Sequence, residues 1–294
     1  MNPGPSAPEA PIPIDYKGLR KSFLEWLKSR GLDKRYIKCV VSYLDRLLAD
    51  RVIKGPMDVV RLFRPLSEGQ RHNLNRAFRN LLNFLECMGW PEAYLNLLRK
   101  NIPRDEVSED LYRPTEERIL ESLKLMEMRA QEKYRLLYWL ILESGGLRLV
   151  EAVRLYNEIR NLEVEELSEG FCKVLLGYFR GTKRTYYAYL SQETYYAILE
   201  APSKPLKYTT VTGCLNKVSK AIIDWKYLRK YAYDKLLELG VPESVADFIQ
   251  GRVPKRIGAK HYLDLRRRAD QYYPRYGQYV ERLRAEALKA VAVA

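Results

Sequence analysis

Apolar residues recur at helical spacing along the first hundred residues, and this pattern predicts a bundle of helices. Segments with one apolar face each cover residues 16–31, 33–52 and 67–89. The third segment opens at Ser67, whose hydroxyl suits a helix N-cap, and it closes at Gly89. Its polar side carries Arg76 and Arg79. We therefore expect residues 16–100 to form a compact helical bundle with basic outer faces.

The helical pattern stops at residues 101–114, where two prolines and an acidic cluster interrupt it. We interpret this segment as an interdomain linker. Helices resume at Thr115, an N-cap candidate that Glu116 and Glu117 follow in the first turn, where the helix dipole favours carboxylates. The predicted parts are a flexible Pro-rich tail, a first domain, the linker and a second domain, at residues 1–15, 16–100, 101–114 and 115–294.

The second domain changes its period along the chain. A buried helix is predicted by the run EKYRLLYWLILESGG, which is strongly apolar. A β-hairpin is predicted further on, because β-branched and aromatic residues in FCKVLLGYF and RTYYAYLS flank the turn RGTK. More helices are expected to begin near Thr209, Trp225, Pro242 and Ala259. The predicted fold class is mainly α with a small β-sheet, and no internal repeat is visible.

The charge distribution points to a class of partner. The 294-residue chain is 47% hydrophobic, as is typical of a globular protein, and its formal net charge is +14. This charge is uneven, because residues 1–100 carry +8, residues 101–170 carry −6 and residues 171–294 carry +12. Two basic segments around an acidic one indicate a protein that grips a polyanion with both ends of its chain.

Several classes of protein are disfavoured by the composition. The cysteines are scattered without a CxxC pair: Cys39, Cys87, Cys172 and Cys214. With only His72 and His261 in addition, the chain lacks the clusters that zinc sites need, and it fits a reducing cytoplasm. No apolar run approaches the ~20 residues of a membrane helix, and the Pro-rich start lacks the features of a signal peptide. We expect neither a metal nor a cofactor.

Candidate chemistry begins in the sequence ESGGLRLVEAVRL. Gly145 and Gly146 end one predicted helix, and Arg148 begins the next, with Glu151 one turn later on the same face. A glycine turn lets the backbone come close to a ligand, and a carboxylate at that spacing can orient the guanidinium. Taken alone, however, this pattern more often marks an ordinary helix junction with a surface ion pair.

Further cations stand at turns and on one helix face. The turn RGTK presents Lys183 at the tip of the predicted hairpin. In the segment WKYLRKYAYDKLL, the side chains of Lys226, Arg229 and Tyr233 lie away from the apolar stripe. Taken singly, a lysine at a turn or a basic helix face is more often simply solvated. The prediction of a functional site therefore depends on the combination of these residues.

In chain order the candidates form one constellation: Arg148, Lys183, Lys226, Arg229, Arg252 and Tyr262. It resembles the active site of the tyrosine recombinases, or phage-type integrases, over residues 115–265. The family's first box, Gly-Leu-Arg with an acidic residue three places on, matches the segment from Gly146 to Glu151. Its second box, His-x-Leu-Arg, matches the segment from Lys226 to Arg229, and the lysine there resembles integrases of archaeal viruses and plasmids of the fusellovirus type.

The sequence departs from the common family pattern at three points. Lys226 and Arg252 stand where the family usually has histidines. The segment between Arg148 and Lys183 is long, and Tyr262 follows Arg252 at a spacing one residue wider than usual.

The resemblance implies that the cations form a cage around a DNA phosphate. Arg148, supported by Glu151, and Arg229 would bind the non-bridging oxygens and stabilise the negative charge that grows in the transition state. Lys226 and Arg252 would supply further hydrogen bonds to the phosphate. No metal is needed in this chemistry, and no ATP, because a phosphotyrosyl intermediate retains the bond energy.

Tyr262 is the expected nucleophile, and the surrounding positive charge should help its hydroxyl to ionise. Lys183 is the expected general acid for the leaving 5′-oxygen, since lysine can shift its pKa and arginine cannot. Other tyrosines lie too far beyond Arg252 for the family's spacing: Tyr272, Tyr273, Tyr276 and Tyr279.

The expected partners are double-stranded DNA attachment sites, on which the resemblance implies a homotetramer, and no membrane. Further basic residues are expected to contact the DNA backbone: Arg76, Arg79, Lys207 and Lys217. Two alternatives stay open, a type IB-like DNA topoisomerase and a non-catalytic DNA-binding relative of the integrases. The helical tail after Tyr262 either docks on a neighbouring subunit or covers its own core.

Overall fold

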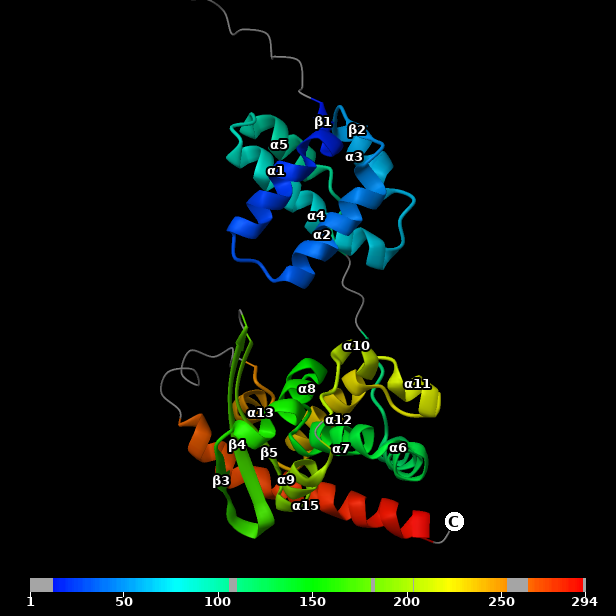
Figure 1. Cartoon of the computed structure of the whole chain (residues 1–294), viewed down its shortest axis with the longest axis vertical. Helices are drawn as coiled ribbons and strands as arrows, with labels where there is room; N and C mark the ends of the chain where they lie inside the picture. The colour runs from blue at the N-terminus through cyan, green and yellow to red at the C-terminus, as the bar shows by residue number, and fades with distance from the viewer. Residues whose placement is uncertain (1–12, 106–109, 181–182, 203, 253–263, 293–294) are drawn as a thin grey trace, which may run out of the picture. The chain divides into compact units, whose positions relative to one another are not determined.

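The computed structural model describes residues 13–105, 110–180, 183–202, 204–252 and 264–292 (Figure 1). It consists of two compact units, Met1–Asp110 and Leu111–Ala294, each with its own apolar core. Their boundary falls inside residues 101–114, the segment interpreted above as a linker. The assignment of separate functional domains to the two sides of this segment stays a prediction.

The first unit is a helical bundle, in agreement with the hydrophobic pattern. Its helices are α1 (Tyr16–Ser29), α2 (Lys34–Leu48), α3 (Pro56–Phe63), α4 (Glu68–Cys87) and α5 (Glu92–Lys100). The long α4 packs against α1, α2 and α5, and Leu44, Phe78 and Leu81 are fully buried in the shared core. Two short strands, β1 (Ile14–Asp15) and β2 (Val52–Ile53), pair antiparallel.

Short polar side chains stand at the starts of α1, α2 and α4. Asp15 caps α1 and Asp33 caps α2 by accepting hydrogen bonds from N–H groups of the first turn. Ser67 is the N-cap of α4, as predicted, and its N–H donates to Gln70 Oε1 at 3.1 Å. Such caps satisfy backbone groups that a helix start leaves without an intrahelical partner.

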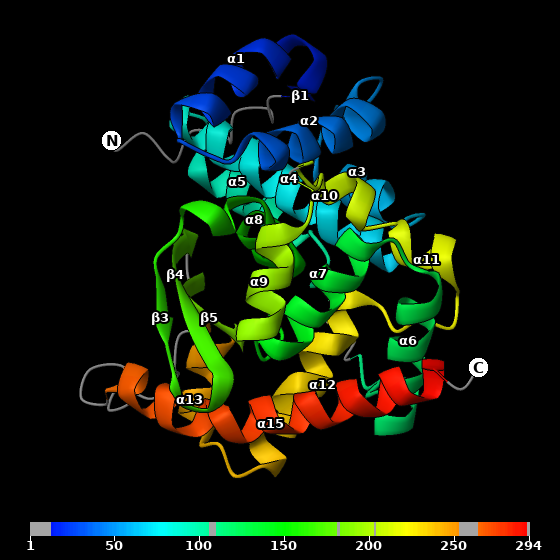
Figure 2. The same cartoon turned by 60° about the horizontal axis from the view of Figure 1, so that its bottom comes forward.

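The second unit combines helices with one antiparallel sheet in the order β3-β4-β5 (Figure 2). The strands are β3 (Val164–Glu166), β4 (Phe171–Arg180) and β5 (Lys183–Ser191). The helices are α6 (Glu116–Arg129), α7 (Glu132–Glu143), α8 (Leu149–Glu158), α9 (Gln192–Glu200), α10 (Tyr208–Val211), α11 (Cys214–Val218), α12 (Trp225–Glu238), α13 (Glu243–Ile249) and α15 (Leu265–Ala292). The predicted class, mainly α with a small β-sheet, is confirmed.

Helix α7 forms the centre of the second unit. Leu137, Leu140 and Ile141 are completely buried, as the apolar run predicted. The helix packs against α6, α8, α9, α12 and α15. Because α7 ends directly before the Gly145-Gly146 turn, this buried helix determines where that turn lies.

The predicted hairpin is confirmed, and β4 and β5 pair up to Arg180 opposite Lys183. Strand β3 was not predicted, because it is short and all its side chains are exposed, so no alternation of apolar and polar residues marks it. Helices α10, α12 and α13 begin beside the predicted starts, at Tyr208, Trp225 and Glu243. The start predicted near Ala259 lies outside the described residues.

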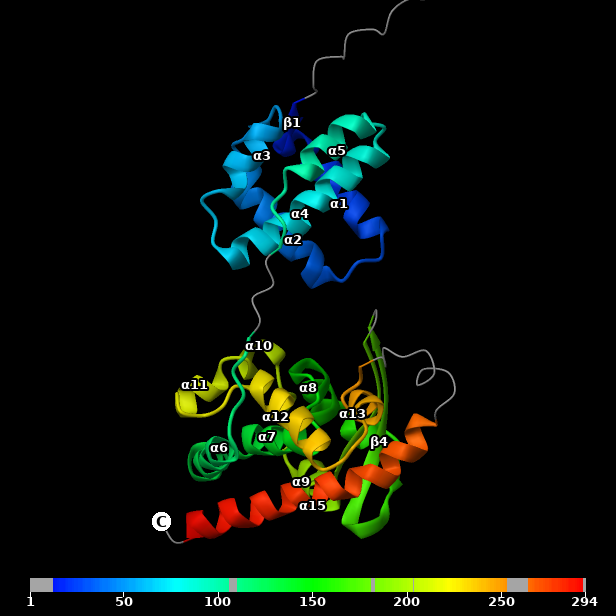
Figure 3. The same cartoon turned by 180° about the vertical axis from the view of Figure 1, so that it is seen from behind.

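Helix α15 covers the core of its own unit, running from the sheet to α6 (Figure 3). Tyr273 and Tyr276 are fully buried and donate hydrogen bonds to the backbone oxygens of Glu143 and Leu142, at 3.1 and 2.7 Å. Arg284 forms a buried ion pair with the Glu143 carboxylate. Of the two roles considered for the tail, packing on its own core is seen here, and docking on a neighbouring subunit stays a prediction.

We expect Arg284→Met to lower the free energy of unfolding of the second unit by about 3–5 kcal/mol, because it leaves the buried Glu143 carboxylate without its charge partner. Arg282→Met, on the exposed face of the same helix, is the matched control and should change stability by less than about 0.5 kcal/mol. Urea denaturation followed by circular dichroism measures both. Equal losses in the two variants would contradict the role of the buried pair.

Candidate active site

The turn between α7 and α8 fixes the position of Arg148. Gly145 and Gly146 have φ angles of +67° and +90°, which glycine adopts far more readily than other residues. Arg148 is the N-cap of α8, and its Nη1 lies 3.0 and 3.2 Å from the carboxylate oxygens of Glu151. The two side chains are only 17% and 11% exposed, so this is not the ordinary surface ion pair that the sequence left open.

Helix α12 approaches this turn closely and brings Arg229 to it. A Cβ on Gly146 would lie 2.7 Å from the Arg229 Cα, so only glycine leaves room for the backbone of α12. The Arg229 guanidinium donates to the backbone oxygen of Gly146 and, at 3.0 Å, to the backbone oxygen of Gln250. The glycine turn and the second cation are therefore parts of one packed junction.

The charge of Arg229 is held in an unfavourable environment. Burial, followed by the neighbouring cations Arg148 and Arg252, lowers the pKa of Arg229 to about 9, so the expectation that an arginine cannot shift its pKa does not hold at this position. Glu151 and Asp247 act in the opposite direction and only partly compensate. At neutral pH the guanidinium is still protonated. A bound anion would therefore be stabilised here by several cations that already lie close together.

Arg252 follows α13 and completes the cluster. Its guanidinium lies over the Tyr233 ring at 4.4 Å and 3.7 Å from Asp247 Oδ1, and its side chain is 41% exposed. Tyr233 donates to the same Asp247 carboxylate at 3.2 Å. Burial, with Asp247 next, raises the pKa of Tyr233 to about 12, so this tyrosine stays protonated and neutral beside the cation.

Strand β5 contacts the cluster through Thr185. The Thr185 hydroxyl lies 3.5 Å from Arg148 Nη1, and Arg148 Nη2 donates to the Gly251 oxygen at 3.1 Å. A Cβ on Gly251, whose φ is +66°, would lie 2.0 Å from Thr185 Oγ1. The hairpin, the start of α8 and the end of α13 therefore meet at Arg148.

The two predicted lysines lie close in sequence to residues of this cluster. Lys183 begins β5 and lies two residues before Thr185, so the two side chains leave the strand on the same face. Lys226 is exposed in the first turn of α12, one turn before Arg229, and its Nζ lies over the Tyr227 ring at 4.4 Å.

Tyr262 lies outside the described residues, which end at Arg252 and resume at Asp264. The predicted backbone contacts Arg76 and Arg79 are exposed on α4 in the first unit, where Arg79 donates to Asn75 Oδ1 at 2.6 Å. Those in the second unit are exposed at α10 and α11: Lys207 and Lys217. The structure thus brings Arg148, Arg229 and Arg252 together.

Thr185, Asp247 and Gln250 contribute to the cluster but were not predicted. Thr185 and Gln250 contact arginines on other elements, Arg148 and Arg229, through a hydroxyl and a backbone oxygen. Asp247 contacts Arg252, five residues further along the chain, through its carboxylate. The only available signal was the place of Gln250, directly before the Gly251-Arg252 pair. A threonine in a strand and an aspartate in a helix gave no such signal.

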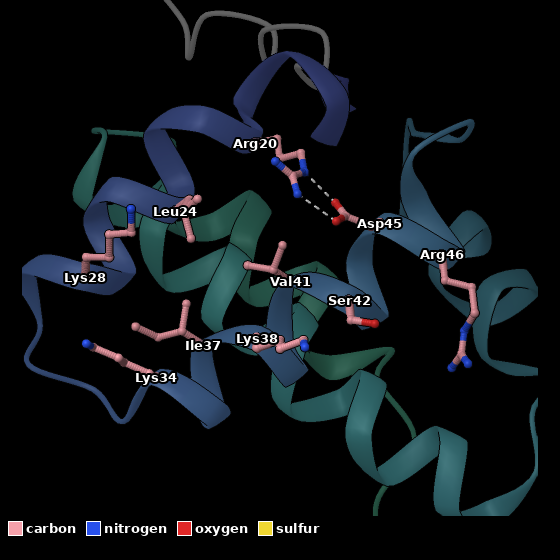
Figure 4. A pocket seen from close by; sticks show the side chains of 10 residues that line it. All are labelled: Arg20, Leu24, Lys28, Lys34, Ile37, Lys38, Val41, Ser42, Asp45 and Arg46. Carbon is pink, nitrogen blue, oxygen red and sulfur yellow. Dashed lines mark hydrogen bonds and ion pairs between the residues drawn. The ribbon is translucent and has the colours of Figure 1, made fainter.

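A basic groove lies between α1 and α2 in the first unit (Figure 4). Its volume is about 830 Å³, and Leu24, Ile37 and Val41 form its apolar part. Several cations surround these residues: Lys28, Lys34, Lys38 and Arg46. This groove is one of the basic outer faces that the sequence predicted for the bundle.

Two further properties concern the described residues alone. Within these ranges, histidine, cysteine and carboxylate side chains do not gather in threes as metal ligands would. No helix in the same part of the chain combines the length and the apolar composition that crossing a membrane requires.

Comparison with known proteins identifies a protein family. Residues 111–279 match the model of the family described as archaeal phage integrase. No curated protein matches the chain.

Among solved structures, the chain is similar to a lambda integrase(75-356) dimer bound to a COC′ core site, with a TM-score of 0.60 and 15% identity, covering 85% of this chain and 98% of that one. It is also similar to a lambda integrase tetramer bound to a Holliday junction, with a TM-score of 0.59 and 16% identity, covering 81% and 77% of the two chains. At this identity the likeness establishes a shared fold.

We expect Gly146→Ala to destabilise the second unit more than Gly170→Ala does. Both replace a glycine of positive φ, with a strain of about 1–3 kcal/mol, but only the Gly146 methyl group would meet the Arg229 backbone. Overpacking should add about 1–3 kcal/mol at that position alone. Thermal denaturation of both variants measures the difference, and equal melting temperatures would show that α12 does not depend on this contact.

Proposed function

The chain belongs to the archaeal phage integrase family of tyrosine recombinases, and from this premise we propose that it is a site-specific DNA recombinase. We propose that it cleaves and rejoins DNA strands through a 3′-phosphotyrosine intermediate and so integrates or excises a mobile element. The observation that carries this proposal is the arginine cluster, in which Arg148, Arg229 and Arg252 converge from three separate elements.

The cluster suits a phosphodiester that gains negative charge during the reaction. Two guanidiniums held by backbone oxygens can bind the two non-bridging oxygens of one phosphate without first reorganising. Arg148 is held by Glu151 and the Gly251 oxygen, and Arg229 by the oxygens of Gly146 and Gln250. The lowered pKa of Arg229 adds support, because a bound phosphate would offset the repulsion among the cations.

Tyr262 is the proposed nucleophile. Its oxygen attacks the phosphorus, the new P–O bond forms as the bond to the 5′-oxygen breaks, and the tyrosine proton is released. Lys183 donates a proton to the leaving 5′-oxygen, so that a 5′-hydroxyl and a 3′-phosphotyrosine result. The burial of Tyr273 and Tyr276 in α15 supports this choice, because neither hydroxyl is accessible to a DNA phosphate.

Two further cations complete the proposed site. Arg252, partly exposed beside the cluster, and Lys226, exposed one turn before Arg229, would donate hydrogen bonds to the phosphate where the family usually has histidines. The stacking of Arg252 on Tyr233 holds its guanidinium in one orientation, which suits a group that must contact an anion.

Double-stranded DNA attachment sites are the proposed substrate, and a homotetramer on DNA is the proposed assembly. The lambda integrases with the same fold are bound to a core site as a dimer and to a Holliday junction as a tetramer. Residues 16–100 would serve as a DNA-binding domain, residues 101–114 as linker and residues 115–294 as the catalytic domain, acting in the cytoplasm. Exposed cations would hold the DNA backbone: Arg76, Arg79, Lys207 and Lys217.

We expect the wild-type chain to form a covalent adduct at the DNA 3′ end on a nicked suicide substrate that carries its attachment site. Tyr262→Phe should bind the same DNA with unchanged affinity and form no adduct, because the nucleophilic oxygen is missing. Denaturing gel electrophoresis with labelled DNA detects the adduct. Adduct formation by Tyr262→Phe would disprove the assignment of the nucleophile.

In the same assay, Arg148→Ala and Arg229→Ala should bind DNA yet form the adduct about 10²–10³-fold more slowly, since each removes one charge-stabilising contact. Arg154→Ala is the matched control, because Arg154 is exposed on α8 and paired with Glu158. Tight, salt-sensitive binding without any adduct in the wild type would favour the non-catalytic DNA-binding alternative. Relaxation of supercoiled DNA without strand exchange would favour the topoisomerase.

A further inference from the structure

Gln250 is a buried amide at the centre of the arginine cluster. It directly follows α13, its side chain is completely buried, and its Nε2 donates to the Gly145 oxygen at 2.6 Å and to the Arg229 oxygen at 2.9 Å. Its own backbone oxygen accepts from the Arg229 guanidinium at 3.0 Å. One residue therefore contacts both the turn before Arg148 and the helix that carries Arg229.

The orientation of this amide follows from its partners. Backbone oxygens only accept hydrogen bonds, so the donating nitrogen, not the oxygen, must face Gly145 and Arg229. The remaining atom, Gln250 Oε1, is buried without a hydrogen-bond partner among the described residues. Burying an unpaired amide oxygen costs about 1–3 kcal/mol, so an apolar side chain would be the more stable choice if this position only filled space.

The side-chain contacts of Gln250 connect the backbone segments that carry the two arginines. The Gly145 oxygen belongs to the turn that leads into Arg148, and the Arg229 oxygen belongs to the backbone that carries the second cation. The next residue, Gly251, accepts from Arg148 at 3.1 Å. The segment Gln250–Gly251 thus contacts both arginines and the backbone next to each, and it sets the separation between them.

That separation matters because two non-bridging oxygens of one phosphate have a fixed spacing. A displacement of about 1 Å in a group that stabilises a transition state can cost about 10²-fold in rate. Space at the junction is also limited, since a Cβ on Gly146 would lie 3.1 Å from Gln250 Nε2. The amide is therefore held between the two backbones.

We propose that Gln250 is a positioning residue for strand cleavage: its side-chain amide fixes Arg148 and Arg229 at the spacing that one phosphate requires. This inference rests on the proposed function. Gln250 itself does not touch the DNA, so its loss should slow the chemical step and leave DNA affinity unchanged.

The test uses the full chain with Gln250→Met, which keeps the side-chain volume and removes both hydrogen bonds. Tyr276→Phe is the matched control, because it also removes a buried side-chain hydrogen bond to a backbone oxygen of this unit, that of Leu142 in α7, and the bond removed involves neither Arg148 nor Arg229. Each variant is measured by melting temperature, by DNA affinity, and by the single-turnover rate of adduct formation at saturating suicide substrate.

We expect both variants to lose a similar amount of thermal stability and to bind DNA within about threefold of the wild type. The adduct rate should fall at least about tenfold in Gln250→Met, and stay within about twofold of the wild type in Tyr276→Phe. A second variant, Gln250→Glu, keeps the shape but turns an oxygen towards the two backbone oxygens, and its rate should fall at least as far. It decides the question if Gln250→Met does not fold.

Normal adduct rates in Gln250→Met or Gln250→Glu would overturn the positioning role while leaving the proposed function intact. The same holds if Tyr276→Phe slows as much as Gln250→Met, because the rate would then follow stability alone. An absent adduct in the wild type would overturn the proposed function and the positioning role together.

Discussion

The close contact between the α7–α8 turn and α12 is the constraint on which the arginine cluster depends. Two backbones meet there with no space for a Cβ, at Gly146 against the Arg229 Cα. This contact lets the Arg229 guanidinium reach the Gly146 oxygen and brings it beside Arg148. A side chain at position 146 would force the turn and α12 apart and so move Arg229 relative to Arg148.

Buried charge is treated in two different ways in the second unit. Glu143 and Arg284 pair directly, and the carboxylate also accepts from Ser191 and Thr194, so this network is satisfied within the fold. Around Arg229, by contrast, cations outweigh the carboxylates and burial lowers its pKa. The first arrangement stabilises the scaffold, whereas the second leaves a positive potential that an external anion can complete.

Much of the fold was predictable from local signals. Helical spacing, the Ser67 cap and the apolar run of α7 identified helices, and the period-two segments around RGTK identified the β4–β5 hairpin. The missed strand β3 has no apolar alternation, since its place in the sheet depends on pairing with β4. The cations that meet in the cluster were predicted because they stand in a recognisable order, with Arg148 next to a glycine pair and Arg252 directly after Gly251.

The sequence by itself determined the order of the chemical groups, the helices and hairpin that carry them, and the excess of positive charge at both ends of the chain. Only the tertiary structure decided that Glu151 is buried, that Arg148 is largely shielded from solvent, and that Thr185, Asp247 and Gln250 join the cluster. The reason is physical. Helix and strand signals arise between neighbours in the sequence, whereas Gln250 and Gly145 are 105 residues apart and meet only because α7, α12 and α13 pack around one core.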